Sequence, residues 1–199
     1  MTRHWLLATL LLTGCSILPE AEALRVYQLP ALSQAGPEAA TARGGEVLRI
    51  NRPRASPLLD STRIVVMPQA DQLSAYQGVR WSDRAPVLLR DRLVAHLRNG
   101  ARFKAVLNDD LTAQASLELA GELHGFQIEY RKGRPRAVIR LQATVLRAGN
   151  REVLASRAFL AEREMRDTSV DAAVEALGLA SDQLAGDLNG WLTALPGAT

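Results

Sequence analysis

The residue with the clearest chemical role is Cys15, the only cysteine of the chain. It closes the tetrapeptide Leu12-Thr13-Gly14-Cys15, an aliphatic residue and two small residues followed by cysteine, which is the bacterial lipobox pattern. Small residues let a peptidase approach the backbone, and a thiol is nucleophilic enough to accept a diacylglycerol as a thioether. The pattern predicts cleavage before Cys15 and attachment of acyl chains such as palmitate. The alternative is a chance buried thiol behind an ordinary signal peptide.

The residues before Cys15 have the layout of an export signal. Arg3 gives a positive start, Trp5 to Leu12 is mostly apolar, and two small residues follow. This is the order of regions in a secretory signal peptide, and the apolar stretch is much shorter than the ~20 residues that span a bilayer. Removal of residues 1–14 leaves 23 Lys and Arg against 21 Asp and Glu, so the formal net charge falls from +3 to +2. Export argues against a nucleic-acid partner.

Candidates for catalysis or metal binding are few. One cysteine excludes an intramolecular disulfide, a redox pair and a multi-thiolate zinc site. His96 and His124 are the only histidines beyond the signal, and no metalloprotease, nucleophile-elbow, P-loop or dinucleotide motif is present. The adjacent Asp109 and Asp110 predict a solvent-facing turn. The sequence therefore predicts a non-enzymatic protein without cofactor or metal.

One cluster of positive charge stands out. Arg131, Lys132, Arg134 and Arg136 lie within six residues, between two predicted strands. Such a cluster could contact an anionic surface such as lipid headgroups or lipopolysaccharide. It could equally be a solvated hairpin tip whose charges discourage edge pairing.

Two tryptophans are candidate anchors for a partner, because aromatic residues are enriched at interface hot spots. These are Trp81 and Trp191. The helical spacing around Trp191 favours a place in the core.

Hydrophobic periodicity predicts the elements that position these residues. Strands are expected at 25–29, 46–52, 62–67, 103–107, 116–130, 137–146 and 152–160, a strand or hairpin at 72–81, and helices at 86–98 and 170–195. The run 62–67 is expected to be a buried central strand, and 46–52 to have a wet face.

Both helices carry an apolar stripe. In the first helix Leu89, Leu93 and Leu97 share one face, with Arg90, Arg92 and Arg98 opposite them. Ser82 or Asp83 is expected to cap its start, and Thr168, with Asp171, the start of the second helix. The long second helix could form a coiled-coil seam, but packing on the sheet is favoured because it covers under four heptads.

These elements predict an α+β fold: a mostly antiparallel sheet with a C-terminal β-meander, covered on one face by two helices. Residues 1–14 are assigned to a lipoprotein signal peptide, 15–24 to a lipidated N-terminus and tether, and 25–199 to a single domain.

The order of several short motifs resembles the ABC-type transport auxiliary lipoprotein family. The motifs are the lipobox, Tyr27-Gln28-Leu29-Pro30, the Ile-Val-Val strand, the 76–81 segment followed by Pro86 and a Leu-rich helix, and Gly121-Glu122-Leu123 leading to Phe126. The resemblance implies an outer-membrane lipoprotein whose body faces the periplasm. It also implies a place beside an ABC permease, its ATPase and an MCE-domain protein that moves lipids between membranes, with this chain docking the conduit at the outer membrane. Ser16, directly after Cys15, implies sorting to the outer rather than the inner membrane.

Two other functions stay open at this stage. A structural lipoprotein that assists outer-membrane or lipopolysaccharide assembly would share the anchor and the sheet. An envelope hydrolase would need Ser or Asp chemistry around His96 or His124. The sequence also leaves open a ring-like homo-oligomer, the transported lipid and its direction.

Overall fold

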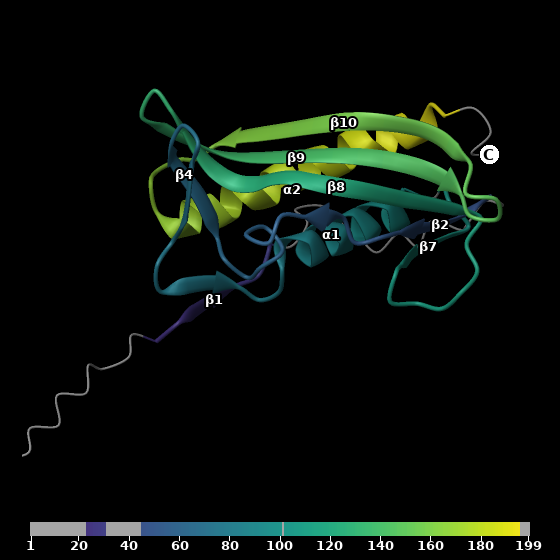
Figure 1. Ribbon diagram of the computed structural model, residues 1–199, viewed down its shortest axis with the longest axis horizontal. Helices are drawn as coiled ribbons and strands as arrows, with labels where there is room; N and C mark the ends of the chain where they lie inside the picture. The colour runs from purple at the N-terminus through teal and green to yellow at the C-terminus, as the bar shows by residue number, and fades with distance from the viewer. Residues whose placement is uncertain (1–22, 31–44, 101, 196–199) are drawn as a thin grey trace, which may run out of the picture.

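Three long strands form the centre of the structure: β8 (Leu117–Arg131), β9 (Arg134–Arg147) and β10 (Val153–Glu164). They pair antiparallel in chain order (Figure 1), so the predicted C-terminal meander is confirmed. The computed structural model describes residues 23–30, 45–100 and 102–195.

The second edge of β8 is shared by three short strands that follow one another along it. β2 (Val47–Ile50), β3 (Arg54–Ala55) and β4 (Val65–Gln69) pair with successive parts of β8, all of them parallel. β7 (Ala105–Asn108) adds parallel to β2, and β5 (Gln72–Ala75) adds antiparallel to β4. The predicted α+β class is confirmed, and the sheet is mixed: its long strands are antiparallel and most of its short ones are parallel to their neighbours.

Burial along β2 and β4 tests the predictions of a wet face at 46–52 and of a buried central strand at 62–67. In β2, Leu48 and Ile50 are buried while the alternate residues are half-buried, which matches the predicted wet face. In β4 only Val65 is buried, and the strand ends exposed at Gln69. Of the predicted buried central strand at 62–67, only Ile64 and Val65 are buried, because β4 leaves the core to form a hairpin with β5.

A second, two-stranded sheet is made by β1 (Arg25–Tyr27) and β6 (Val79–Trp81), which pair parallel. The prediction of one strand or hairpin over 72–81 is wrong, since β5 and β6 belong to different sheets. Gly78 turns the chain between them with φ of 66°, a conformation that glycine adopts without a steric cost.

A β-bulge explains the change of phase within β8. Leu123 pairs with Leu141 and Gly125 pairs with Arg140, so His124 is an extra residue without an opposite partner. Buried apolar side chains fall on odd positions up to Leu123 and on the even positions Phe126 and Ile128 beyond the bulge. The bulge keeps both halves of β8 facing the core despite this shift.

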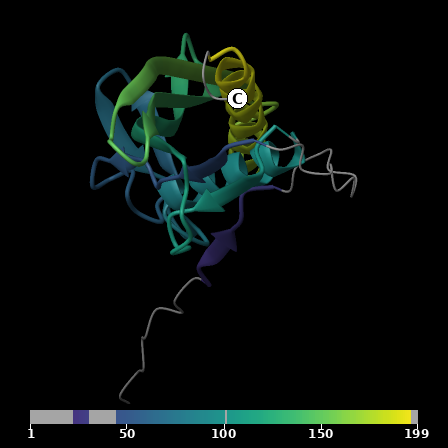
Figure 2. The same cartoon turned by 90° about the vertical axis from the view of Figure 1, so that its right-hand side faces the viewer.

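The helices α1 (Ala85–Asn99) and α2 (Val170–Thr193) lie on the same face of the sheet (Figure 2). α2 packs against β9, β10 and α1, so its apolar stripe serves the core and not a coiled-coil seam. The prediction of two helices on one face is confirmed. Within the described residues, neither helix has the length and apolarity needed to cross a bilayer.

Both predicted helix caps are displaced along the chain. The residue before α1 is Arg84, whose side chain makes no capping bond, in place of the predicted Ser82 or Asp83. The cap of α2 is Ser169 and not Thr168, because the Ser169 hydroxyl accepts a hydrogen bond from the Ala172 amide at 3.1 Å.

The core fills the space between the sheet and the two helices. Trp81 is completely buried and meets Phe126 edge to face, with ring centroids 6.0 Å apart. Other fully buried large side chains are Leu48, Ile50, Ile64, Leu89, Leu93, Leu97, Leu117, Leu123, Ile128 and Ile139. Trp81 is therefore a core residue and not an exposed partner anchor.

Candidate functional site

The segment that follows the predicted tether is bound to the body of the protein. Cys15 and the rest of the lipobox, Leu12, Thr13 and Gly14, lie outside the described residues. Nine residues, 16–24, separate Cys15 from the first residue of β1. Any lipid on Cys15 is thus connected to the fold through β1.

Hydrogen bonds fix β1 on two sides. The Arg25 amide donates to the Gly78 carbonyl at 3.0 Å, and the Ser82 amide donates to the Tyr27 carbonyl at 2.7 Å. The Tyr27 hydroxyl donates to Asp171 Oδ1, in the first turn of α2, at 2.8 Å. This hydrogen bond raises the pKa of Tyr27. β1 is therefore tied to both β6 and α2.

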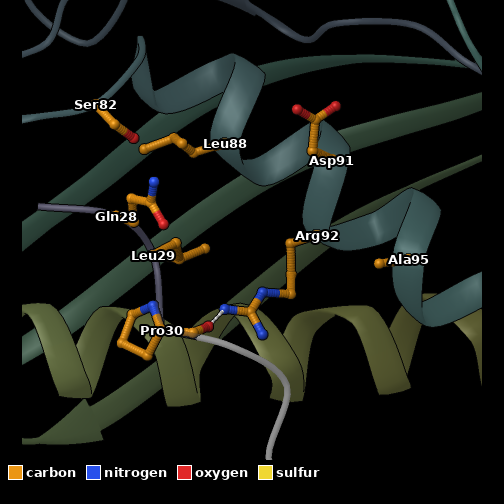
Figure 3. Close-up of a pocket in the computed structure, with 8 residues that line it drawn as sticks. All are labelled: Gln28, Leu29, Pro30, Ser82, Leu88, Asp91, Arg92 and Ala95. Atoms are coloured by element: carbon orange, nitrogen blue, oxygen red, sulfur yellow. Dashed lines mark hydrogen bonds between the residues drawn. The ribbon is translucent and has the colours of Figure 1, made fainter. Parts of the chain in front are cut away.

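The chain then passes over a groove beside α1, shown in Figure 3. The groove has a volume of about 310 Å³ and is lined by Gln28, Leu29, Pro30, Ser82, Leu88, Asp91, Arg92 and Ala95. Arg92 donates to the Pro30 carbonyl, and its Nη1 donates to Asp182 Oδ1 on α2 at 2.9 Å. On the α2 side, a Cβ atom added to Gly178 would lie only 3.0 Å from Pro30 Cδ.

Arg92 was predicted to lie opposite the apolar stripe of α1, but the structure buries it. Its side chain is 5% exposed, because the segment ending at Pro30 and helix α2 close over it. Burial lowers the pKa of Arg92, and attraction to Asp182 offsets only part of this effect. One guanidinium thus joins α1, α2 and the chain that leads to the tether.

Arg90 of α1 was also predicted to lie opposite the apolar stripe, and it too is buried. Its side chain is 6% exposed and pairs with Asp109 at 2.5 Å, Asp110 at 3.0 Å and Asp91 at 2.9 Å. Burial opposes its charge, but the hydrogen bonds that Arg90 donates to Asp109 and Asp91 outweigh this and raise the pKa of Arg90. The Asp109-Asp110 turn therefore holds α1 and is not merely solvent-facing.

The basic turn, residues 131–136, joins β8 to β9. Lys132 and Gly133 adopt φ of 52° and 75°, as a tight hairpin turn requires. Arg131 pairs with Glu162 at 2.8 Å, and Arg136 pairs with the same carboxylate at 3.0 Å. The structure thus divides the predicted cluster into two neutralised arginines and two exposed cations.

The two exposed cations are Lys132 and Arg134. Among the described residues, neither forms an ion pair with a carboxylate. They remain available to an anion outside the chain.

The remaining candidate residues lie apart from one another. His124 projects from the bulge, 58% exposed, with Nε2 3.8 Å from Glu122, while His96 is on α1. Trp191 is half-buried and stacks edge to face on Phe159, with centroids 5.5 Å apart. In the part of the chain that the structure describes, no group of three His, Cys, Asp or Glu side chains could hold a metal ion.

A buried ion pair inside the sheet was not foreseen from the sequence. Glu129 is 4% exposed and accepts two hydrogen bonds from Arg140, at 2.5 and 3.1 Å. Burial acts to raise the pKa of Glu129, but the hydrogen bonds and charge of Arg140 outweigh it and lower the pKa. The sequence does place opposite charges on adjacent predicted strands, but only the strand register shows which of them form an ion pair.

Comparison with known proteins identifies the family. The sequence model of the ABC-type transport auxiliary lipoprotein component matches residues 27–189. The chain belongs to this family. The match begins at Tyr27, the last residue of β1, and ends in α2, so it includes the groove and the basic turn.

Two solved structures resemble this chain in fold. A crystal structure of a protein from Xanthomonas campestris is similar at 27% sequence identity and a TM-score of 0.74, covering 83% of this chain and 93% of that one. A hypothetical protein from Chlamydia trachomatis shares the fold at a TM-score of 0.52, 8% identity, and coverage of 78% and 100%.

A curated relative is longer than this chain. It is an uncharacterised protein of Bradyrhizobium diazoefficiens, 28% identical over 165 residues, which are 83% of this chain and 44% of the relative. The chain therefore spans under half the length of that relative.

Proposed function

We propose that this family member is a non-enzymatic outer-membrane lipoprotein that docks the periplasmic conduit of an ABC and MCE-type lipid transport system at the outer membrane. The observation that carries the proposal is the family match over residues 27–189, which names an ABC transport auxiliary lipoprotein. The MCE-domain protein, the ABC permease and its ATPase are the proposed partners.

The proposed anchor is the acylated Cys15. Two or more acyl chains, at ~0.8 kcal/mol per buried methylene, hold a protein stably on a bilayer, whereas one chain does not. An anchor at Cys15 would hold the folded body near the membrane, because β1 is hydrogen-bonded to both β6 and α2. The body is thereby connected to the membrane through a short tether and a fixed segment.

The proposed lack of enzymatic activity is supported by the structural role of the buried charges, which pair with one another. Arg90, Arg92 and Glu129 each have an oppositely charged partner from another element. These contacts hold the helices and strands together, whereas catalytic groups are arranged around a space that a substrate can enter.

The anchor is tested by replacing Cys15 with serine. Wild-type protein is expected to incorporate labelled palmitate and to fractionate with outer membranes, while Cys15→Ser stays unlabelled and unprocessed. Ser16→Asp is the matched sorting variant: it should keep the label but move the protein to the inner membrane. Palmitate incorporation by Cys15→Ser would exclude this anchor.

The partner is tested by co-purification from detergent-solubilised envelopes. The tagged wild-type protein is expected to recover an MCE-domain protein. The control is residues 1–24 fused to an unrelated lipoprotein body, which keeps the membrane but lacks the fold. Recovery of lipopolysaccharide-assembly proteins without an MCE-domain protein would support the structural-assembly alternative and contradict the proposal.

A further inference from the structure

The basic turn and the segment leading to the tether lie at the same end of the molecule. The Met165 amide donates to the Pro135 carbonyl, beside the turn, at 3.1 Å. Asp171, six residues further along, accepts the hydrogen bond from Tyr27. Figure 1 shows β1, β4 and the start of α2 at this end, while the β9–β10 turn lies at the other.

The surface at this end combines unpaired cations with exposed apolar side chains. Within the described ranges, Lys132 and Arg134 on the turn and Arg25 on β1 have no carboxylate partner. Leu24 and Val26, on the segment that enters from the tether, are 52% and 51% exposed. Cations beside exposed apolar residues are the composition that binds an anionic bilayer surface.

Nearby carboxylates reduce this positive charge only in part. Glu162 pairs with both Arg131 and Arg136, and Arg166 pairs with Asp167 and Glu175. Asp71, in the β4–β5 turn, and Asp171, in the first turn of α2, are exposed carboxylates at this end that form no ion pair among the described residues. The unpaired cations Lys132, Arg134 and Arg25 outnumber these two carboxylates.

The tether limits how far this end can move from a membrane. Ten residue steps separate Cys15 from Arg25, so at about 3.5 Å per step the reach is at most roughly 35 Å. β9 has 14 residues and at ~3.3 Å per residue extends roughly 45 Å from the basic turn toward the opposite end. The tether therefore keeps the end with β1 and the basic turn within reach of the lipid, but it does not by itself hold that end against the bilayer.

We infer that this end faces the membrane, with Lys132 and Arg134 in contact with anionic lipid headgroups, so that the β9–β10 turn points into the periplasm toward the partner. The inference rests on the proposed anchor at Cys15. It assigns the basic turn an orienting role, because an acyl tether by itself fixes the distance to the membrane but not the face of the body that is presented.

The experiment measures which end approaches the bilayer. Lipidated, mature full-length protein is bound to vesicles that contain a headgroup-quencher lipid, with a fluorophore on a cysteine introduced at one of two positions. Ala70→Cys places it beside the basic turn, because β4 runs parallel to β8 as far as Glu129; Asn150→Cys places it at the opposite end. The acylated Cys15 has no free thiol to react with the label.

On phosphatidylglycerol vesicles, the probe at Ala70→Cys is expected to be quenched strongly and that at Asn150→Cys weakly. The contrast should disappear on neutral phosphatidylcholine vesicles and at high salt. Lys132→Gln with Arg134→Gln should reduce the preference for this orientation about 30-fold. As a control, Lys104→Gln with Arg151→Gln removes the same charge at the other end, where Arg151 pairs with Glu118, and should leave the preference unchanged.

Two results would overturn the inference and have different meanings. Protein that floats with the vesicles but shows equal quenching on both lipids, or is unaffected by the change at Lys132 and Arg134, has its anchor but no orienting turn. Protein that does not float lacks the anchor, which removes the proposed function together with the inference.

Discussion

Replacing Asp182 by asparagine removes the charge that faces Arg92 while keeping the size of the side chain and a hydrogen-bond acceptor. The Arg92 side chain is 5% exposed and that of Asp182 is 26% exposed. Among the described residues, Asp182 is the carboxylate that pairs with Arg92, and the other partner, the Pro30 carbonyl, is neutral. The substitution therefore leaves a buried guanidinium without a counter-charge.

The expected cost follows from this geometry. Breaking a fully buried ion pair costs about 3–5 kcal/mol, and partial exposure of Asp182 lowers this to about 2–4 kcal/mol. For a protein of this size, that loss corresponds to a fall in melting temperature of roughly 5–15 °C. Arg92→Met combined with Asp182→Leu should recover much of the loss, because it removes both charges together.

Urea denaturation in the Cys15→Ser background measures this free energy of unfolding. Asp187→Asn, an exposed aspartate on the same helix, is the matched control and should change it by less than about 0.5 kcal/mol. If Asp182→Asn and Asp187→Asn have the same small effect, the Arg92 contact contributes nothing to stability and the reasoning is refuted.

Three further predictions concern packing, the N-terminal segment and pH. Gly121→Ala should lose about 1–3 kcal/mol in urea denaturation, because its Cβ would lie 2.9 Å from the Gln142 carbonyl oxygen, whereas Gly186→Ala, with open space around it, should gain about 0.5–1 kcal/mol. Gly178→Ala should push Pro30 away, so trypsin should cleave faster after Arg25 while the urea midpoint of the body is kept. The stability advantage of wild type over Glu129→Gln should be full at neutral pH and shrink as pH falls below 4.5, since the pKa of Glu129 is lowered on folding; a constant difference down to pH 3 would contradict this.

The periodicity of apolar residues was sufficient to predict the positions of the long strands and helices. The meander and both helices were predicted near their observed positions, because each buries one face with a regular spacing of apolar residues. The phase change in β8 was visible as Leu123 followed by Phe126, and the structure shows its cause in the bulge at His124.

Pairings between short strands could not be predicted in the same way. β2, β3 and β4 all align parallel with β8, which begins more than fifty residues after β2 and β3 and nearly fifty after β4. The split of 72–81 into two sheets likewise depends on β1, which pairs with β6 across the chain. A short strand carries too few residues for its own sequence to specify its partner.

The sequence by itself determined the lipobox around Cys15, the order of the long elements and the resemblance to the family, because each of these depends on residues close together in the chain. Only the tertiary structure decided the roles of the charges. Arg92 is buried by residues 62 and 90 positions away, and Glu162 neutralises Arg131 and Arg136 while Lys132 stays exposed. Contacts of this kind follow from the packing of distant elements, for which a helical or strand period contains no signal.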